Sequence, residues 1–379
     1  MKSAIQTFLS KGPPDEAAIA AFIAAHGTFP IVEGRQATFV YHGPADAVNL
    51  RHWVFGLASS QPFERVAGTD LWHHTLEIPP QSRVEYKLEI VQADRRQWIQ
   101  DPLNPNLAHD PFGANSVAHG KGYARPDWTE PDADARKGTI KEMLFAQTTL
   151  GGPRRVSVYL PARFRETRRY PLLIVHDGGD YMRYASLQTV LDNLIHRLEV
   201  APLIVALTHP GDRLSEYPNN AHHSAFIAQQ VLPEMQAKFP LYEAPSSRCL
   251  MGASFGGVAA LATAWRYPGT FGRLLLQSGS FAFTDIGESK RGPTFAKVVD
   301  FVNAFRDKPG KPSEKVYVSC GTYESLIYEN RTMIPVLQGT GMDVRYEEAR
   351  DGHNWENWRD RLRSGLSWLF PGPLWMVYE

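Results

Sequence analysis

The pattern Gly252-Ala-Ser254-Phe-Gly256 is the part of the sequence with the clearest chemical potential. An apolar run at 248–251 (Arg-Cys-Leu-Met) precedes it, and the small residues 257–264 favour a helix directly behind it. A turn this tight between a strand and a helix leaves room only for glycine at 252 and 256, strains the backbone of Ser254 and lifts its hydroxyl above the sheet edge. Because the first N–H groups of the helix point at the same place, we predict that Ser254 is a nucleophile.

A serine hydroxyl is a weak nucleophile at neutral pH, so it needs a base and a group that orients the base. Enzymes with this kind of turn carry the serine, the acid and the histidine in that chain order. His353 is the only one of the 13 histidines that follows Ser254, and it comes just after the last expected strand. For the acid we predict Glu324, in the loop after the expected strand 315–320, with Asp285 and Glu329 as weaker alternatives.

The tetrahedral intermediate of such a reaction needs two backbone N–H donors for its oxyanion. The N–H of Phe255, the residue after the serine, is predicted to be one of them. The other should come from the loop His176-Asp-Gly-Gly-Asp-Tyr, in which glycines let the backbone approach a substrate closely. Gly179 or Asp180 is our first choice for this second donor, followed by Gly178.

Other clusters of potential ligands do not predict a metal site or a cofactor. His176-Asp177, His73-His74 and His222-His223 fit no usual zinc spacing, and we expect them to be surface or packing residues. Cys249 and Cys320 lie in apolar, strand-like runs and are expected to be buried thiols. A disulfide between them is possible only if their strands are neighbours.

Composition and charge exclude several other classes of function. The 40 lysines and arginines balance 40 aspartates and glutamates, which gives no support for nucleic-acid binding. No apolar run is long enough to span a membrane. The N-terminus lacks the apolar core and cleavage site of a secretory signal, so we expect a cytoplasmic protein.

The length of the sequence and the change in its residue patterns predict two domains. Residues 1–34 contain a helical segment at 14–26, and residues 35–124 show the strand rhythm of an immunoglobulin-like β-sandwich, with strands at 37–41, 49–55, 71–78 and 83–91. Residues 125–138 are rich in proline and aspartate and are predicted to be a linker.

From 139 to 379, strands alternate with helices, which is typical of a mostly parallel sheet flanked by helices. The strands are expected at 155–160, 171–176, 203–207, 248–251, 273–277, 315–319 and 344–347. The helices are expected at 185–198, 221–239, 257–267, 294–306, 324–339 and 355–369.

Taken together, these motifs resemble the esterase-D-like α/β-hydrolases, a family that includes enterochelin (siderophore) esterases and feruloyl esterases. The similar segments cover most of 139–370: 172–179, Asp212-Arg-Leu-Ser-Glu-Tyr, Leu232-Pro-Glu-Met, 251–257, Cys320-Gly-Thr-Tyr-Glu-Ser-Leu and Asp351-Gly-His-Asn-Trp-Glu-Asn-Trp. Residues 68–76, 84–88 and 101–106 are similar to the early-set, immunoglobulin-like domain that often precedes such esterases.

The resemblance implies an α/β-hydrolase fold behind a β-sandwich, with Ser254 as nucleophile, His353 as base and Glu324 at the acid position. The chain departs from the family pattern at two points. The family often has aspartate at the acid position, and some siderophore esterases use a Ser–His dyad. The family also often reads Gly-Gly-His-Asp-Trp where this chain has Asp351-Gly-His-Asn-Trp.

Three residues are predicted to contact substrate. Arg213 looks like a residue that lines the site in these relatives, although an internal ion pair with Glu216 is an equal alternative. Tyr181 is assigned to the same substrate site, and Trp355 is a candidate to pack against an aromatic acyl group. Trp355 and Trp358 are one helical turn apart and could equally be core residues, which we favour for Trp358.

The sequence therefore predicts a serine esterase of the enterochelin-esterase type, without a cofactor, that acts on a small-molecule ester such as a ferric catecholate siderophore. A monomer or a homodimer is expected. The cytoplasmic expectation favours this substrate, because ferric siderophores are hydrolysed inside the cell. The alternatives are a carbohydrate esterase that acts on feruloyl or acetyl groups, and a binding protein with weak catalysis.

Overall fold

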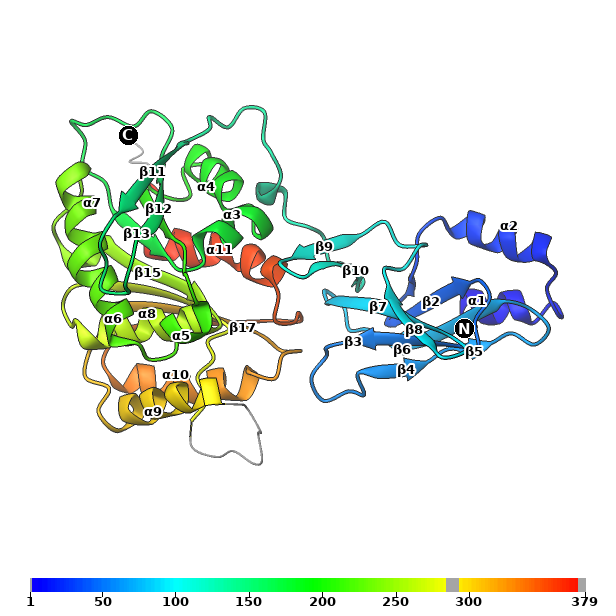
Figure 1. The fold of residues 1–379 in the computed structure, drawn as a ribbon. Coiled ribbons are helices and arrows are strands. Elements are labelled where there is room, and N and C mark those ends of the chain that lie inside the picture. Colours follow the sequence, from blue (N-terminus) through cyan, green and yellow to red (C-terminus); the bar gives the residue numbers. More distant parts are fainter. Residues whose placement is uncertain (1, 284–292, 374–379) are drawn as a thin grey trace. The chain divides into compact units, whose positions relative to one another are not determined.

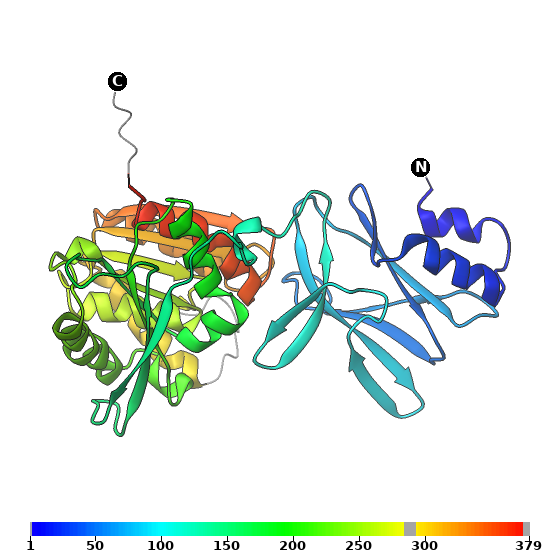
Figure 2. The same cartoon turned by 90° about the horizontal axis from the view of Figure 1, so that it is seen from above.

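The computed structural model describes residues 2–283 and 293–373, and it divides the chain into two compact units (Figures 1 and 2). Unit 1 comprises the chain up to Arg125 together with two short later segments, 321–324 and 349–354. Unit 2 comprises the rest of the chain from Pro126 onward. The two short segments of unit 1 include Glu324 and His353.

Unit 1 is a sandwich of two antiparallel sheets, which confirms the predicted β-sandwich (Figure 2). In order across the first sheet the strands are β1 (Ile31–Glu33), β2 (Gln36–His42), β6 (Leu71–Glu77) and β5 (Glu64–Arg65). The second sheet is ordered β4 (Ser60–Pro62), β3 (Ala47–His52), β7 (Arg83–Gln92), β10 (Gly113–His119) and β9 (Leu107–Asp110), with β8 (Arg95–Ile99) paired to β7.

The sandwich forms because apolar side chains alternate along its strands and meet in one core. Phe39, Leu50, Tyr86 and Leu88 are each no more than 1% exposed in that core. Strand β3 ends at His52, so the expected strand 49–55 is too long. Beyond His52, the large apolar side chains that suggested a continuing strand are exposed instead of buried.

Two helices begin the chain and pack on a second small core of unit 1. Helix α2 (Glu16–His26) confirms the predicted segment, with Asp15 capping its N-terminus. Helix α1 (Ala4–Leu9) was not predicted, because it is short; a capping box between Ser3 and Gln6 stabilises it.

Unit 2 contains an eight-stranded sheet in the order β11, β12, β14, β13, β15, β16, β17, β18. Strands β13 to β17 run parallel to one another, whereas β12 is antiparallel to its neighbours β11 and β14, which confirms a mostly parallel sheet. The bounds are β11 (Thr139–Phe145), β12 (Arg154–Leu160), β13 (Leu172–Val175), β14 (Ile204–Thr208), β15 (Arg248–Ala253), β16 (Arg273–Gln277), β17 (Lys315–Gly321) and β18 (Asp343–Ala349).

Helices cover both faces of this sheet (Figure 1). One core includes side chains of α7 (Leu232–Lys238), α8 (Phe255–Arg266), α9 (Pro293–Asp307) and α10 (Ile327–Gly339). The opposite core includes side chains of α3 (Gly178–Tyr184), α4 (Leu187–His196) and α11 (Trp355–Leu369). The short helices α5 (Arg213–Glu216) and α6 (Ala221–Ala225) follow β14.

Three segments of unit 2 differ from their predicted form. The expected helix 221–239 is divided into α6, a π-helical segment at Phe226–Val231, and α7, where a proline near the start of α7 interrupts regular α-helical bonding. Helix α10 begins at Ile327 rather than 324. The segment predicted as a linker contains a 3₁₀ turn (Asp127–Thr129) whose Trp128 is 4% exposed.

The two cysteines are both buried free thiols, as expected. They lie on β15 and β17, which are separated by β16, so the neighbouring arrangement that a disulfide would need does not occur. None of the helices that the structure describes combines the length and apolar character needed to cross a membrane.

The central position of β13 generates a stability prediction. Ile174 lies on this strand, is 0% exposed and packs in the first core of unit 2. We expect Ile174→Ala to lower the free energy of unfolding by about 2–5 kcal/mol in urea denaturation, because it leaves a cavity that the core fills only in part. The control is Ile140→Ala on edge strand β11, where Ile140 is 36% exposed and the loss should be about 0.5 kcal/mol. Equal losses would contradict this description of the core.

Candidate active site

Ser254 occupies the sharp turn between β15 and α8 that its sequence predicts. Its backbone has φ of 57° and ψ of −121°, an unfavourable conformation for a residue with a side chain. A Cβ atom on Gly252 would lie 2.3 Å from the carbonyl oxygen of Gly256, so only glycine fits there. The N–H of Ser254 donates to the carbonyl of Gln277 at 2.9 Å, which ties the turn to β16.

The Ser254 hydroxyl lies 3.2 Å from the hydroxyl of Ser280. Ser280 is 2% exposed, and its N–H donates to the carbonyl of Ser254 at 3.2 Å. The two residues therefore hold each other through both backbone and side chain. Sequence analysis missed Ser280, because it lies 26 positions beyond the turn and in no recognisable motif.

The predicted oxyanion donors lie on two helix starts at the same edge of the sheet in unit 2. Phe255 is the first residue of α8, and Gly178, Gly179 and Asp180 form the first turn of α3. Strands β13 and β15, which lead into these helices, are adjacent and parallel. The N–H groups of a first helical turn have no acceptor within the helix, so these groups can donate to an oxyanion.

Close packing fixes the two helix starts against their surroundings. A Cβ on Gly178 would lie 2.5 Å from the Cβ of Leu207, so this glycine is needed for the close approach of α3 to β14. A Cβ on Gly256 would lie 3.3 Å from the Cβ of His176, which places the turn at Ser254 beside the end of β13.

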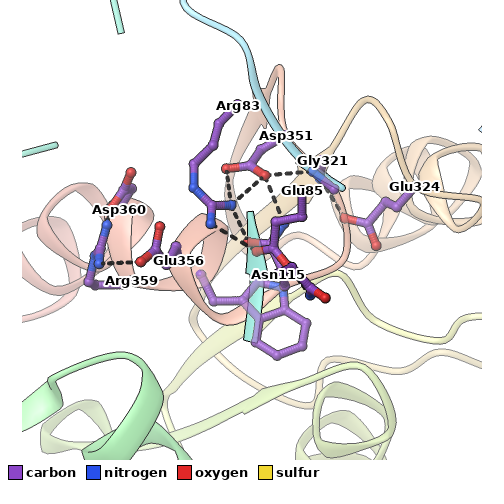
Figure 3. Close-up of polar contacts among 12 residues, drawn as sticks. Arg83, Glu85, Asn115, Gly321, Glu324, Asp351, Glu356, Arg359 and Asp360 are labelled. Carbon is purple, nitrogen blue, oxygen red and sulfur yellow. Dashed lines mark hydrogen bonds and ion pairs between the residues drawn. The ribbon is translucent and has the colours of Figure 1, made fainter. Parts of the chain in front are cut away.

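Glu324 and His353 form a hydrogen-bonded pair within unit 1. The Nδ1 atom of His353 lies 2.5 Å from Oε2 of Glu324, whose side chain is 1% exposed. The other carboxylate oxygen accepts the N–H of Gly321 at 2.6 Å (Figure 3). An ionised carboxylate only accepts hydrogen bonds, so Nδ1 carries the hydrogen and Nε2 is the nitrogen that can accept a proton.

Of the two alternative acids, the structure describes Glu329. Glu329 lies on α10, beyond the loop that carries Glu324. Asp285 lies outside the described residues. Of the two candidate acids that the structure describes, Glu324 is therefore the one that binds Nδ1 of His353.

Arg213 pairs with Asp177, and the predicted alternative of an ion pair with Glu216 is wrong. Its Nε atom lies 2.9 and 3.0 Å from the two carboxylate oxygens of Asp177. Glu216 is bound instead by Arg154 at 2.6 Å. Burial lowers the pKa of the Arg213 guanidinium, but the Asp177 carboxylate outweighs it and raises that pKa overall. The side chain of Arg213 remains 32% exposed.

Tyr181 and Trp355 are packed in the second core of unit 2. Tyr181 is 0% exposed, and its hydroxyl donates to Oε1 of Gln277 at 2.8 Å. The substrate contact predicted for Tyr181 does not fit this burial. Trp355 is 9% exposed and packs edge-on against Tyr181 and Trp358, which favours its alternative role in the core. Trp358 is a core residue, as predicted.

His176 and His223 are packed in the interior of unit 2. His176 bonds the carbonyl of Met251 through Nδ1 at 2.9 Å, and its ring lies 5.2 Å from that of the buried His223. Burial lowers the pKa of both imidazoles. Across residues 2–283 and 293–373, no group of three or more His, Cys, Asp or Glu side chains is arranged to hold a metal ion.

Known proteins are similar to this chain in sequence and in fold. A family model described as putative esterase matches residues 147–369. The iron(III) enterobactin esterase of Escherichia coli K12 is 26% identical over 339 residues, which covers 81% of this chain and 82% of that protein. The crystal structure of an enterobactin esterase from Shigella flexneri, determined in the presence of enterobactin, has a TM-score of 0.72 at 23% identity and covers 88% of this chain and 92% of that chain.

The chain is also similar, at lower identity, to an esterase of a different kind. A ferulic acid esterase from the fungus Anaeromyces mucronatus has a TM-score of 0.52 at 15% identity and covers 64% of this chain and 94% of that chain. The enterobactin esterases match more of the chain than this protein does.

The parallel sheet and the serine turn define an α/β-hydrolase. The chain belongs to the putative esterase family, whose model matches more than half of its length, and it is a carboxylic ester hydrolase. Within this family it is similar to the enterobactin esterases, as the sequence motifs indicated.

The packing at the serine turn gives a second stability prediction. Gly252→Ala places a methyl group against the backbone of Gly256, and we expect it to lower the free energy of unfolding by about 1–3 kcal/mol. Gly339→Ala is the matched control, because its Cβ would meet no atom within 4 Å and alanine suits a helix better than glycine. The control should be neutral or stabilising by up to about 1 kcal/mol in the same denaturation experiment. A tolerated Gly252→Ala would refute the tight turn.

Proposed function

We propose that this protein is a serine esterase that hydrolyses siderophore esters through an acyl-enzyme. The observation that carries the proposal is the Glu324–His353 pair, in which a buried carboxylate binds Nδ1 of the only histidine downstream of Ser254. A carboxylate in this position fixes the tautomer of the imidazole and stabilises its protonated form. The ring is thereby prepared to act as a general base through Nε2.

In this mechanism, Ser254 Oγ attacks the carbonyl carbon of the ester while its proton passes to Nε2 of His353. The oxyanion accepts hydrogen bonds from the N–H of Phe255 and from that of Gly179, Asp180 or Gly178. The imidazolium then gives its proton to the leaving alcohol, and the acyl group remains on Ser254. Water, deprotonated by His353, attacks the acyl-enzyme, and the imidazolium then returns the proton to Ser254 Oγ as the acid is released.

The order of the strands supports the assignment of these residues to one reaction. Strands β15, β16 and β17 are consecutive and parallel in the sheet. Ser254 follows the carboxyl end of β15, and the segment with Glu324 follows the carboxyl end of β17. In open parallel sheets, active sites form at this edge.

The proposed substrate is a catecholate siderophore ester. Support comes from relatives named as enterobactin esterases, which match this chain beyond the limits of the family model. Arg213 is proposed to contact the substrate, because its partly exposed guanidinium can attract an anionic iron–catecholate complex while Asp177 holds it in place. The iron in this account belongs to the substrate.

Replacing the three proposed catalytic residues tests the mechanism. We expect Ser254→Ala and His353→Ala each to lower kcat/KM for an activated ester by about 10⁴-fold, because the attack loses its nucleophile or its base. Glu324→Ala should cause a smaller loss, since the base remains but is no longer oriented. Steady-state hydrolysis and covalent labelling by a fluorophosphonate probe measure these effects.

Glu329→Gln is the control for the acid, and it should retain activity close to that of the wild type. A loss below tenfold for Glu324→Ala would reject Glu324 as the orienting acid. Wild-type protein that is not labelled, or labelling that survives Ser254→Ala, would instead favour a binding protein without this chemistry.

Substrate preference is tested with esters that differ in class. We expect kcat/KM for a trilactone catecholate to exceed that for methyl ferulate and for acetylated xylan. In Arg213→Met, KM for the catecholate should rise while hydrolysis of a small neutral ester changes little. A preference for methyl ferulate or acetylated xylan would contradict the siderophore assignment and leave the esterase mechanism intact.

A further inference from the structure

Arg83, the first residue of β7, is a charged side chain that is 1% exposed in unit 1. A buried guanidinium is tolerated only where acceptors compensate for the water that it loses. Arg83 donates to Oε1 of Glu85 at 2.8 Å and to Oδ1 of Asp351 at 3.1 Å (Figure 3). It also donates to Oδ1 of Asn354 at 2.9 Å. Two of these three acceptors therefore come from the segment 349–354 rather than from the strand itself.

Those two acceptors flank His353 in the chain. Asp351 precedes the histidine by two residues, and Asn354 follows it directly. Oδ1 of Asp351 also accepts the N–H of Gly352 at 2.7 Å and the side-chain amide of Asn354 at 2.8 Å. Arg83 thus holds the segment on both sides of the imidazole, and its own N–H adds a bond to the carbonyl of Arg350 at 2.9 Å.

The segment with Glu324 is attached to the same part of unit 1. The N–H of Tyr323 donates to the carbonyl of Asp351 at 3.0 Å, and the hydroxyls of Tyr323 and Ser82 lie 2.6 Å apart. The N–H of Phe55 donates to the carbonyl of Tyr323 at 2.7 Å. Glu324 and His353 therefore both lie on segments that are hydrogen-bonded to the start of β7 and to residues near it in unit 1.

The charges around Arg83 make this arrangement sensitive to its removal. Glu85 uses its second oxygen to accept from the side chain of Asn115 at 2.8 Å. Burial raises the pKa of Asp351 to about 6, while Arg83 opposes that rise. Without the guanidinium, the buried Asp351 carboxylate and the partly buried Glu85 carboxylate would remain without this cation between them, so the segment 349–354 would have to move or Asp351 would have to take up a proton.

We propose that Arg83 is a positioning residue for the ester hydrolysis, which it supports by fixing the segment that carries His353 through Asp351 and Asn354. The inference rests on the proposed role of His353 as the base. Asp351 and Asn354 are also the positions where this chain departs from the family pattern Gly-Gly-His-Asp-Trp. The departure therefore coincides with the residues that bind Arg83, and unit 1 contributes to turnover through this bond.

Arg83→Met in the full-length chain tests the proposal. We expect kcat to fall by about 10²-fold with KM changed by less than about twofold, because a displacement of about 1 Å of a catalytic group has this effect on rate. The rate of fluorophosphonate labelling should fall in parallel. Arg83→Lys should retain the charge but not the forked geometry of the guanidinium, so its kcat should lie between those of the wild type and Arg83→Met. Guanidinium ion should partly restore the kcat of Arg83→Ala.

Tyr86→Phe is the matched control on the same strand. Tyr86 is 0% exposed, donates to Asp101 at 2.6 Å and accepts from Asn104 at 3.0 Å, and none of these partners belongs to the two segments. The control should lower the melting temperature without lowering kcat. If Arg83→Met loses no more kcat than Tyr86→Phe at a similar loss of melting temperature, Arg83 has only a structural role and the proposal is wrong.

A double-mutant cycle keeps the test decisive if Arg83→Met folds poorly. Asp351→Leu removes the buried carboxylate, so the double variant with Arg83→Met should fold better than Arg83→Met and lose no more kcat than either single variant. Losses of kcat that multiply would overturn the proposal. A wild-type protein without esterase activity would refute the proposed function itself, whereas an active wild type with an equally active Arg83→Lys and Arg83→Met refutes only the positioning role.

Discussion

A carboxylate removed from water must be compensated by hydrogen bonds, and Glu324 shows how the structure meets this constraint. One bond comes from the N–H of Gly321 and another from Nδ1 of His353. Both oxygens accept a hydrogen bond at 1% exposure of the side chain, so moving the imidazole away would remove one of the bonds that compensate a buried charge. The tautomer and orientation of His353 follow from this requirement, and so does its proposed role as a base.

A steric constraint acts on the other half of the proposed reaction. The backbone of Gly256 lies so close to Gly252 that position 252 cannot carry a side chain, and Ser254 is left in a backbone conformation that the surrounding sheet and helix must enforce. The buried sheet supplies that rigidity, because β13, β15 and β16 are covered by helices on both faces. Backbone N–H groups at the starts of α3 and α8 are fixed in the same way.

Much of this could be predicted from sequence, because the signals are local. The alternation of apolar strands with helices predicted the parallel sheet, and Gly252-Ala-Ser254-Phe-Gly256 predicted the strained turn. The strand ending at His52 and the broken helix at 221–238 were harder, since exposed aromatic residues resemble a strand and a π-helical segment has no local signature. The spacing of apolar residues indicates which face of a helix or strand is buried, but it does not indicate at which residue that element ends.

Contacts between residues distant in sequence could not be predicted. The pairing of Arg213 with Asp177 rather than Glu216, and the burial of Tyr181, depend on how α3 and α5 pack on the sheet. Arg83 and Asp351 are 268 positions apart. The local sequence shows only that Arg83 begins a strand and that Glu85, two positions later, lies on the same face. This pattern does not reveal a partner on a distant segment.

The most direct test of the central claim is to identify the covalent intermediate. Protein mixed rapidly with an activated ester of a slowly released acid, quenched in acid and digested, should yield one acylated peptide, with the acyl group on Ser254. The adduct should form as fast as the burst of released alcohol, and it should be absent from His353→Ala. Turnover without an adduct on Ser254, or with an adduct on another residue, would contradict the account.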